Sequence, residues 1–355
     1  MTGVAPVGVS ISRRPARLGD GVATGGDRLV DRFGRVHRDL RISITDRCNL
    51  RCVYCLPEEG VEFTPKGRIL TFDELARVAR VAHTLGVTRV RVTGGEPLVR
   101  RGLESFVAML AEIGFADLSM TTNGIGLERR AQALADAGLR RLNISCDSLR
   151  PERFAQIRRS GDLARVLVAM DAAERAGLVP LKVNVVVLAG INDDEIVDFA
   201  AFARDSGRIV RFIEYMPLDG AGRWDRANVV PASHIIESIG ERWPLEAVRP
   251  SDADPSAPAT RYRFTDGIGE IGVIPTVTEP FCGTCDRLRI TADGAIRNCL
   301  FANEETPLRD LLRHGGSDEA IALSLRRAVD AKLPGHGIND PGFLRPARSM
   351  SMIGG

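Results

Sequence analysis

Three cysteines within eight positions, in the segment DRCNLRCVYCLP (residues 46–57), have the clearest chemical meaning in this 355-residue chain. They are Cys48, Cys52 and Cys55, spaced Cys-x3-Cys-x2-Cys. A structural zinc site generally needs four protein ligands, and the neighbouring sequence offers no fourth. A four-iron cluster can instead be held by three thiolates, which leaves one iron open for a small molecule. The spacing therefore predicts an iron-sulfur cluster, with free core thiols as the alternative.

A second cysteine triad lies in FCGTCDRLRITADGAIRNC and consists of Cys282, Cys285 and Cys299. The pattern predicts a β-hairpin on a two-residue turn, Asp293-Gly294. In that register Cys299 would lie opposite Leu288, so the returning strand would bring Cys299 back beside Cys285.

Zinc is a stronger alternative at this second triad, because His314 or His336 could supply the missing ligand. Two triads that each lack one ligand favour two iron-sulfur clusters instead. Each cluster would then keep one iron open for a small molecule.

Basic residues near the triads predict an anionic ligand. Arg287 and Arg289 alternate with apolar residues, so both point to one face of their strand. One guanidinium group can donate two parallel hydrogen bonds to the oxygens of a phosphate. Lys182, one of only three lysines, interrupts the apolar run LKVNVVV, where an unpaired charge is costly. The alternatives are a solvated strand face for the arginines and an exposed strand end for Lys182.

Alternating strand and helix patterns must position these residues. Apolar strands are predicted at residues 40–45, 89–95, 117–124, 141–146, 181–188 and 209–218. Helical patterns that end near glycine lie between them, for example at residues 72–86, 103–114 and 193–207. Six such units predict an α/β fold with a parallel sheet. A closed barrel has eight units, so we expect a partial, open β/α barrel with the first triad at its mouth.

The chain is expected to have three parts. Residues 1–36 are rich in glycine and small residues and are interpreted as a mobile leader, with a transit peptide as the alternative. Residues 37–220 form the barrel. Residues 221–355 form an α+β segment, with the hairpin and a helix at 318–332, that covers the open side and holds the second triad.

The composition argues against large anionic partners. The net charge is +2, with 44% hydrophobic and 26% charged residues, which gives no electrostatic case for nucleic acid or membrane. No apolar run approaches the roughly 20 residues of a membrane helix. We therefore expect a cytoplasmic protein with reduced cysteines, and seven is an odd count for a disulfide framework.

The first triad resembles the cluster motif of radical S-adenosylmethionine (SAM) enzymes. The resemblance implies that the open iron binds SAM and that one electron cleaves SAM to a 5′-deoxyadenosyl radical. TGGEP, residues 93–97, would meet the amino group of SAM, although a plain turn before a helix explains it equally. The residues that fall at SAM-contacting positions are Tyr54, Gly95, Ser145 and Met216. Tyr54 and Met216 also suit a packing role.

Both triads together, with the arginines after the second and a Gly354-Gly355 terminus, resemble the GTP 3′,8-cyclase family over residues 37–355. The resemblance implies conversion of GTP to (8S)-3′,8-cyclo-7,8-dihydroguanosine 5′-triphosphate in molybdenum cofactor biosynthesis. The second cluster would hold the purine. GTP-binding positions are Arg41, Arg91, Thr122, Lys182, Arg287 and Arg289. Catalytic positions are Arg287, Arg289, Gly354 and Gly355.

The same resemblance implies a homodimer, an electron donor of unknown identity, and cyclic pyranopterin monophosphate synthase as the next enzyme. Two positions depart from the family pattern. Arg89 stands where relatives often have lysine, and Cys146 stands where they have an aliphatic residue. Cys146 is expected to be a small buried hydrophobe.

Two rival functions remain open at this point. One is another two-cluster radical SAM enzyme, such as one that modifies a peptide, although no long cysteine array or peptide-docking region is visible. The other is a non-catalytic iron-sulfur binding module. Such a module would not need Arg287, Arg289 and Lys182 near its clusters.

Overall fold

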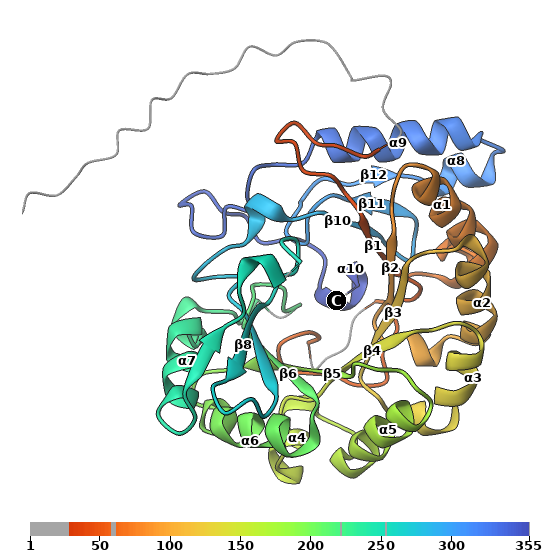
Figure 1. The fold of residues 1–355 in the computed structure, drawn as a ribbon. Helices are drawn as coiled ribbons and strands as arrows, with labels where there is room; N and C mark the ends of the chain where they lie inside the picture. The colour runs from red at the N-terminus through yellow and green to blue at the C-terminus, as the bar shows by residue number, and fades with distance from the viewer. Residues whose placement is uncertain (1–27, 58–61, 221, 253, 355) are drawn as a thin grey trace, which may run out of the picture.

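Six parallel strands, each followed by helical structure, form the frame of the protein (Figure 1). The structure is a computed structural model that describes residues 28–57, 62–220, 222–252 and 254–354. The strands are β1 (Asp39–Ser43), β2 (Arg89–Thr93), β3 (Asp117–Thr122), β4 (Arg141–Ser145), β5 (Lys182–Val187) and β6 (Ile209–Glu214). All six lie where the sequence predicts them. β6 ends at Glu214 rather than at 218, and Pro217 has no N–H for a ladder.

Helices pack against the outer face of the parallel strands (Figure 1). They are α1 (Phe72–Thr84), α2 (Leu103–Ile113), α3 (Ala131–Asp136), α4 (Pro151–Arg158), α5 (Leu163–Arg175), α6 (Ile196–Ser206) and α7 (Ala232–Gly240). Along β1 the buried Leu40 and Ile42 join the core beneath these helices, while the alternate residue Arg41 points to the other side. In the described part of the chain, no helix has the length and apolarity to cross a membrane.

The carboxy-terminal segment extends the sheet at both edges. It contributes the strands β7 (Leu245–Ala247), β8 (Thr260–Phe264), β9 (Glu270–Ile274), β10 (Arg287–Ile290), β11 (Ala295–Arg297) and β12 (Thr306–Pro307). β10 pairs in parallel with β1, and β9 pairs in parallel with β6. The strand order is β12-β11-β10-β1-β2-β3-β4-β5-β6-β9-β8-β7. The predicted α/β fold with an open, mainly parallel sheet is confirmed.

Short helices complete the segment and the loops. Three α-helices follow β12: α8 (Arg309–Arg313), α9 (Asp318–Asp330) and α10 (Met350–Ile353). The 3-10 helices are η1 (Lys66–Arg68), η2 (Pro97–Val99), η3 (Leu127–Arg129), η4 (Asp193–Glu195), η5 (Arg226–Asn228), η6 (Pro250–Asp252) and η7 (Cys282–Thr284). α10 lies at the centre of the ring of strands, near the end of the chain (Figure 1).

The hairpin β10–β11 forms, but its predicted register is wrong by one residue. Arg289 pairs with Arg297 and Ile290 with Ile296, so the register continues to Arg287, not Leu288, opposite Cys299. The reason is the loop, which has three residues rather than two. Its last residue, Gly294, has φ +83°, a left-handed conformation that glycine adopts without strain.

The packed chain begins earlier than residue 37, so the predicted leader is too long. Leu29 is buried in the core, and Val30 and Val36 form an antiparallel bridge. Asp31 accepts hydrogen bonds from the side chain of Arg35 and contacts His37. The buried Leu29 and the paired charges of Asp31 and Arg35 therefore hold residues 28–36 in place. The rest of the predicted leader, residues 1–27, lies outside the described residues.

Candidate active site

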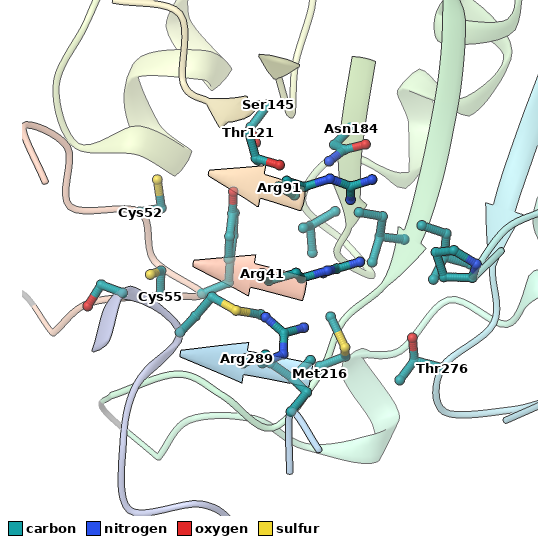
Figure 2. A pocket seen from close by; sticks show the side chains of 18 of the residues that line it. Arg41, Cys52, Cys55, Arg91, Thr121, Ser145, Asn184, Met216, Thr276 and Arg289 are labelled. Atoms are coloured by element: carbon teal, nitrogen blue, oxygen red, sulfur yellow. The ribbon is translucent and has the colours of Figure 1, made fainter. Parts of the chain in front are cut away.

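One cavity inside the sheet contains the cysteines of both triads. Cys48, Cys52, Cys55, Cys282, Cys285 and Cys299 all line it. Figure 2 shows Cys52 and Cys55 beyond the carboxyl ends of strands that carry Arg41, Arg91 and Arg289. Cys48 and Cys299, which are 299 − 48 = 251 positions apart, therefore share one site.

The thiols of the first triad are buried close to one another. Burial raises the pKa of Cys48 to about 11. Burial, followed by the neighbouring thiols of Cys52 and Cys48, also raises the pKa of Cys55. The backbone N–H of Leu50 lies 3.4 Å from the sulfur of Cys48. Bringing three such thiolates together is unfavourable without a cation, so the triad suits a metal cluster that would supply the compensating charge.

A buried ion pair supports this triad. Nη1 of Arg158 donates to the sulfur of Cys52 at 3.4 Å, and Nη2 lies 2.7 Å from Oδ2 of Asp147. The Tyr54 hydroxyl donates to the same carboxylate at 2.8 Å, and Val186 N–H donates to its other oxygen at 2.9 Å. The hydroxyl of Tyr54 is thus committed to Asp147, while its side chain lines the cavity.

The two glycines of TGGEP let the cysteine loop pack on the end of β2. A Cβ on Gly94 would lie 2.6 Å from the carbonyl oxygen of Thr45, and one on Gly95 would collide with that of Arg47. Gly95 N–H also donates to the Thr45 carbonyl at 2.6 Å. The close approach that we expected for a ligand is made in part by the chain itself. Gly95 nevertheless lines the cavity.

Glu96, the next residue, is a buried carboxylate at the same strand ends. It accepts hydrogen bonds from the Thr122 hydroxyl and the Asn123 N–H, both at 2.6 Å, and from Leu98 N–H at 3.0 Å. Burial raises its pKa despite these three donors. The Thr122 hydroxyl also accepts from Gly124 N–H at 3.0 Å. Thr122 lines the cavity, but its hydroxyl holds the Glu96 carboxylate.

Three arginines on adjacent strands face the cavity in one row. Arg41 on β1 is in register with Arg289 on β10 and with Arg91 on β2. Burial, then the charges of Arg289 and Arg91, hold the pKa of Arg41 well below its usual value. Burial and Arg287 lower the pKa of Arg289 to about 10. Unpaired buried cations are costly, so an anion in the cavity would stabilise this row.

Two further basic residues lie on β5 and β6: Arg211, which lines the cavity, and Lys182, which lies beside it. Lys182 shares a strand face with Asn184, which lines the cavity, although Lys182 itself does not. Burial and Arg211 lower the pKa of Lys182 to about 7. Arg211 lines the cavity and donates to Oδ1 of Asn184 at 2.7 Å and of Asn143 at 2.8 Å. Sequence analysis missed Arg211, although a charge within the apolar strand IVRFIE was a signal.

The second triad is more electropositive than the first. Nε of Arg287 donates to the sulfur of Cys285 at 3.3 Å. Burial raises the pKa of Cys285, but the charges of Arg287 and Lys332 outweigh burial and lower it to about 7. Among the described residues, no group of three His, Cys, Asp or Glu side chains converges tightly enough to hold a single metal ion. A cluster does not require such convergence, because each thiolate binds a different iron.

The carboxy-terminal end enters the same cavity. Met350 and Ser351 of α10 line it, and the Arg289 guanidinium donates to the carbonyl oxygen of Gly354. Gly354 has φ +88°, and a Cβ there would lie 2.5 Å from Oγ1 of Thr93. Only glycine fits this position. Gly355 lies outside the described residues.

The other predicted positions are placed as follows. Ser145 and Met216 line the cavity with Tyr54 and Gly95, and both are seen at its wall in Figure 2. Arg89 forms ion pairs with Asp254 and with Asp286. Cys146 is fully buried in the hydrophobic core, as expected.

Asp147, Arg158 and Glu96 were missed by sequence analysis. Glu96 belongs to a motif that was noticed, so it could have been found. Arg158 could not, because an arginine is not distinctive in a chain whose 48 basic residues include only three lysines.

Comparisons with known proteins agree with this site. Residues 42–203 match the Radical SAM superfamily, and residues 208–338 match Molybdenum Cofactor Synthesis C. The chain is 48% identical over 354 residues to a GTP 3′,8-cyclase of Mycobacterium sp. strain KMS, covering 99% of both chains. It is 49% identical over 333 residues to the GTP 3′,8-cyclase of Streptomyces coelicolor, covering 93% of this chain and 97% of the relative.

Solved structures show the same fold at low sequence identity. Streptococcus suis SuiB bound to S-adenosylmethionine has a TM-score of 0.58 at 15% identity, covering 80% of this chain and 67% of SuiB. The structure of anSMEcpe with bound AdoMet has a TM-score of 0.56 at 14% identity, covering 84% and 79%. With its near-full-length relatives, the chain belongs to the GTP 3′,8-cyclase family of radical SAM enzymes.

Proposed function

We propose that the two triads divide the reaction of this radical SAM enzyme, which converts GTP to its 3′,8-cyclo product in molybdenum cofactor biosynthesis. Cys48, Cys52 and Cys55 hold the 4Fe-4S cluster that binds SAM. Cys282, Cys285 and Cys299 hold a second 4Fe-4S cluster, whose open iron binds the purine. The support is that both triads line one cavity.

A cluster held by the first triad would give one electron to SAM, and the resulting 5′-deoxyadenosyl radical would remove the ribose C3′ hydrogen of GTP. The chain's own contribution is to orient SAM and to exclude water. Tyr54, Gly95, Ser145 and Met216 line the wall beside the triad and contact SAM in this proposal. Glu96 is held by three donors at the same wall, so its carboxylate is positioned to accept from the amino group of SAM.

The row of Arg289, Arg41 and Arg91 is the observation that carries the GTP assignment. These side chains come from three neighbouring strands and line the same cavity as the two triads; Figure 2 shows them beside Cys52 and Cys55. A triphosphate is the part of GTP that such a row would recognise, because guanidinium groups pair with phosphate oxygens. Arg287 and Lys182 add charge on either side. Thr122 contributes through Glu96 or through direct contact with GTP.

The proposed catalytic residues are Arg287, Arg289, Gly354 and Gly355. Arg289 bridges the row and the chain end by its hydrogen bond to Gly354. A tail inserted between the triads would exclude water and position the ribose toward SAM. We further propose a cytoplasmic homodimer that passes its product to cyclic pyranopterin monophosphate synthase, as the family resemblance suggests.

Anaerobic reconstitution tests this function. The protein is loaded with iron and sulfide, iron is counted, and SAM and dithionite are added with and without GTP. About eight irons per chain, for two four-iron clusters, with 5′-deoxyadenosine formation stimulated by GTP, would support the proposal. About four irons per chain would contradict the proposal of a second cluster. Eight irons without a response to GTP would contradict the substrate assignment.

A further inference from the structure

Lys332 is a buried lysine that no role described so far explains. It follows α9, outside the parallel strands, and only 5% of its surface is exposed. In residues 28–57, 62–220, 222–252 and 254–354, no carboxylate forms an ion pair with it. A buried ammonium group needs both hydrogen-bond acceptors and a counter-charge, and its surroundings show what supplies them.

All three protons of the Lys332 ammonium group have an acceptor at the second triad. Nζ lies 3.6 Å from the sulfur of Cys285, 2.9 Å from the carbonyl oxygen of Arg287 and 2.7 Å from that of Asn298. An ammonium group has three donors, so none is left over. One acceptor is a triad sulfur, and another is the carbonyl adjoining Cys299.

Arg35 completes this arrangement from the amino-terminal side. Its guanidinium donates to the carbonyl oxygen of Cys282 at 2.8 Å and to that of Leu333 at 2.7 Å. It therefore ties the residue after Lys332 to the first cysteine of the triad. Unlike Lys332, Arg35 has its own counter-charge, because its Nε donates to Asp31 at 2.6 Å.

We propose that Lys332 is a positioning residue for the second iron-sulfur cluster: its ammonium group holds the two cysteine-bearing segments together and shares with Arg287 the role of counter-charge to the Cys285 thiolate. The inference rests on the proposal that this triad holds a cluster. Together, Arg35 and Lys332 donate a hydrogen bond at each cysteine of the triad. Arg35 donates to the carbonyl of Cys282, and Lys332 donates to the sulfur of Cys285 and to the carbonyl that precedes Cys299. A cation that donates to a ligand sulfur favours the reduced, more negative cluster and raises its reduction potential.

The first triad offers a comparison within the same chain. There Arg158 donates to the sulfur of Cys52, but it is also paired with the carboxylate of Asp147. Lys332, which shares the sulfur of Cys285 with Arg287, has no such carboxylate partner among the described residues. Its positive charge is therefore offset by the thiolates rather than by a carboxylate.

The test isolates the second cluster in the full-length chain. Cys48, Cys52 and Cys55 are replaced by alanine, and this parent is compared with the same chain carrying Lys332→Met, Lys332→Gln or Lys332→Arg. Glutamine keeps donors for the carbonyls of Arg287 and Asn298 but removes the charge. The exposed Lys66 provides a matched control, Lys66→Met. Iron and sulfide are counted after desalting, and the midpoint potential is measured by EPR-monitored titration.

We expect about four irons per chain in the parent and in Lys66→Met. Lys332→Met should lose at least about half of this iron, because two buried carbonyls lose their donor. Lys332→Gln should keep more iron but show a lower potential, and Lys332→Arg should restore the potential toward that of the parent. Circular dichroism identifies an unfolded variant, and the glutamine variant decides the question if the methionine variant does not fold.

The outcomes separate the two proposals. A parent without iron would overturn the second cluster itself. A parent with about four irons, whose iron content and potential are unchanged in the folded methionine or glutamine variant, would overturn the role of Lys332 and leave the cluster standing. A lower potential that arginine does not restore would also contradict the role of the charge.

Discussion

Arg41 and Arg289 lie in register on adjacent parallel strands, β1 and β10, so two buried guanidinium groups face one cavity side by side. Two positions earlier on β1, Asp39 is in register with Arg287 on one side and Arg89 on the other. That layer contains its own counter-charge. The next layer, toward the triads, has Arg289, Arg41 and Arg91 without a carboxylate in the row, and we propose that the triphosphate of GTP binds there.

Replacement of Arg41 by methionine should weaken GTP binding and stabilise the protein without ligand. A hydrogen bond to a charged group contributes about 1.5–3 kcal/mol, so the Kd for GTP should rise by roughly ten- to a hundredfold. Removing one of three neighbouring buried cations should raise the Tm of the apo protein. Calorimetric titration and thermal melts measure both. Arg129→Met, at an exposed side chain, is the control, and an unchanged Kd in Arg41→Met would refute the role of the row.

Lys182 predicts a pH dependence of stability. Its pKa falls from 10.5 to about 7 on folding, through burial and neighbouring arginines. Between these values the unfolded chain carries a proton that the folded chain lacks, so stability should rise with pH across this window. The slope from one group is at most about 1.4 kcal/mol per pH unit. Urea unfolding of the apo protein between pH 7 and 9 should show a shallower slope in Lys182→Met than in the original chain.

Binding of GTP should raise the lowered pKa of Lys182 back toward its usual value. A triphosphate near Lys182 favours the ammonium form, so GTP binding at pH 8 should take up as much as about one proton. Calorimetry in two buffers with different ionisation enthalpies measures this uptake. The uptake should disappear in Lys182→Met. Equal uptake in both proteins would place the proton on another group.

The ion pair of Arg158 with Asp147 should be essential for the stability of the first triad region. Both side chains are buried, and removing one partner leaves the other charge uncompensated. Arg158→Met should cost about 3–5 kcal/mol in the free energy of unfolding, measured with urea on the apo protein. Adding Asp147→Asn should recover part of this loss. Arg150→Met, which removes an exposed partner of Asp194, should leave stability unchanged.

A methyl group at Gly354 should displace the end of the chain from the cavity. The left-handed backbone and the contact with Thr93 both exclude alanine. Because small displacements of positioning groups strongly slow chemistry, Gly354→Ala should lower turnover by about tenfold or more. The measurement is the rate of formation of the cyclised product. Gly342→Ala, where a Cβ meets nothing within 4 Å, is the matched control, and normal turnover in Gly354→Ala would exclude a role for the tail.

The local sequence pattern was sufficient to predict the strands and the residues that share one face of the hairpin. Alternation placed Arg287 and Arg289 on one face, and both line the cavity. The register failed because an Asp-Gly pair is compatible with both two- and three-residue loops. A two-residue type I′ turn needs a positive φ at both residues, and Asp293 does not have one, so the structure forms the three-residue loop. The leader was drawn too long because a single buried residue, Leu29, leaves no periodic signal.

The sequence by itself determined the thiol spacings, the order of strands and helices, and the basic residues available to an anion, because these depend on residue type and local periodicity. Only the tertiary structure decided that β10 pairs with β1 and thereby places Arg289 beside Arg41. It also decided that Lys332 reaches Cys285 and that Arg158 reaches Cys52. These contacts join distant segments, and their geometry follows from sheet pairing and burial, which no local pattern of residues specifies.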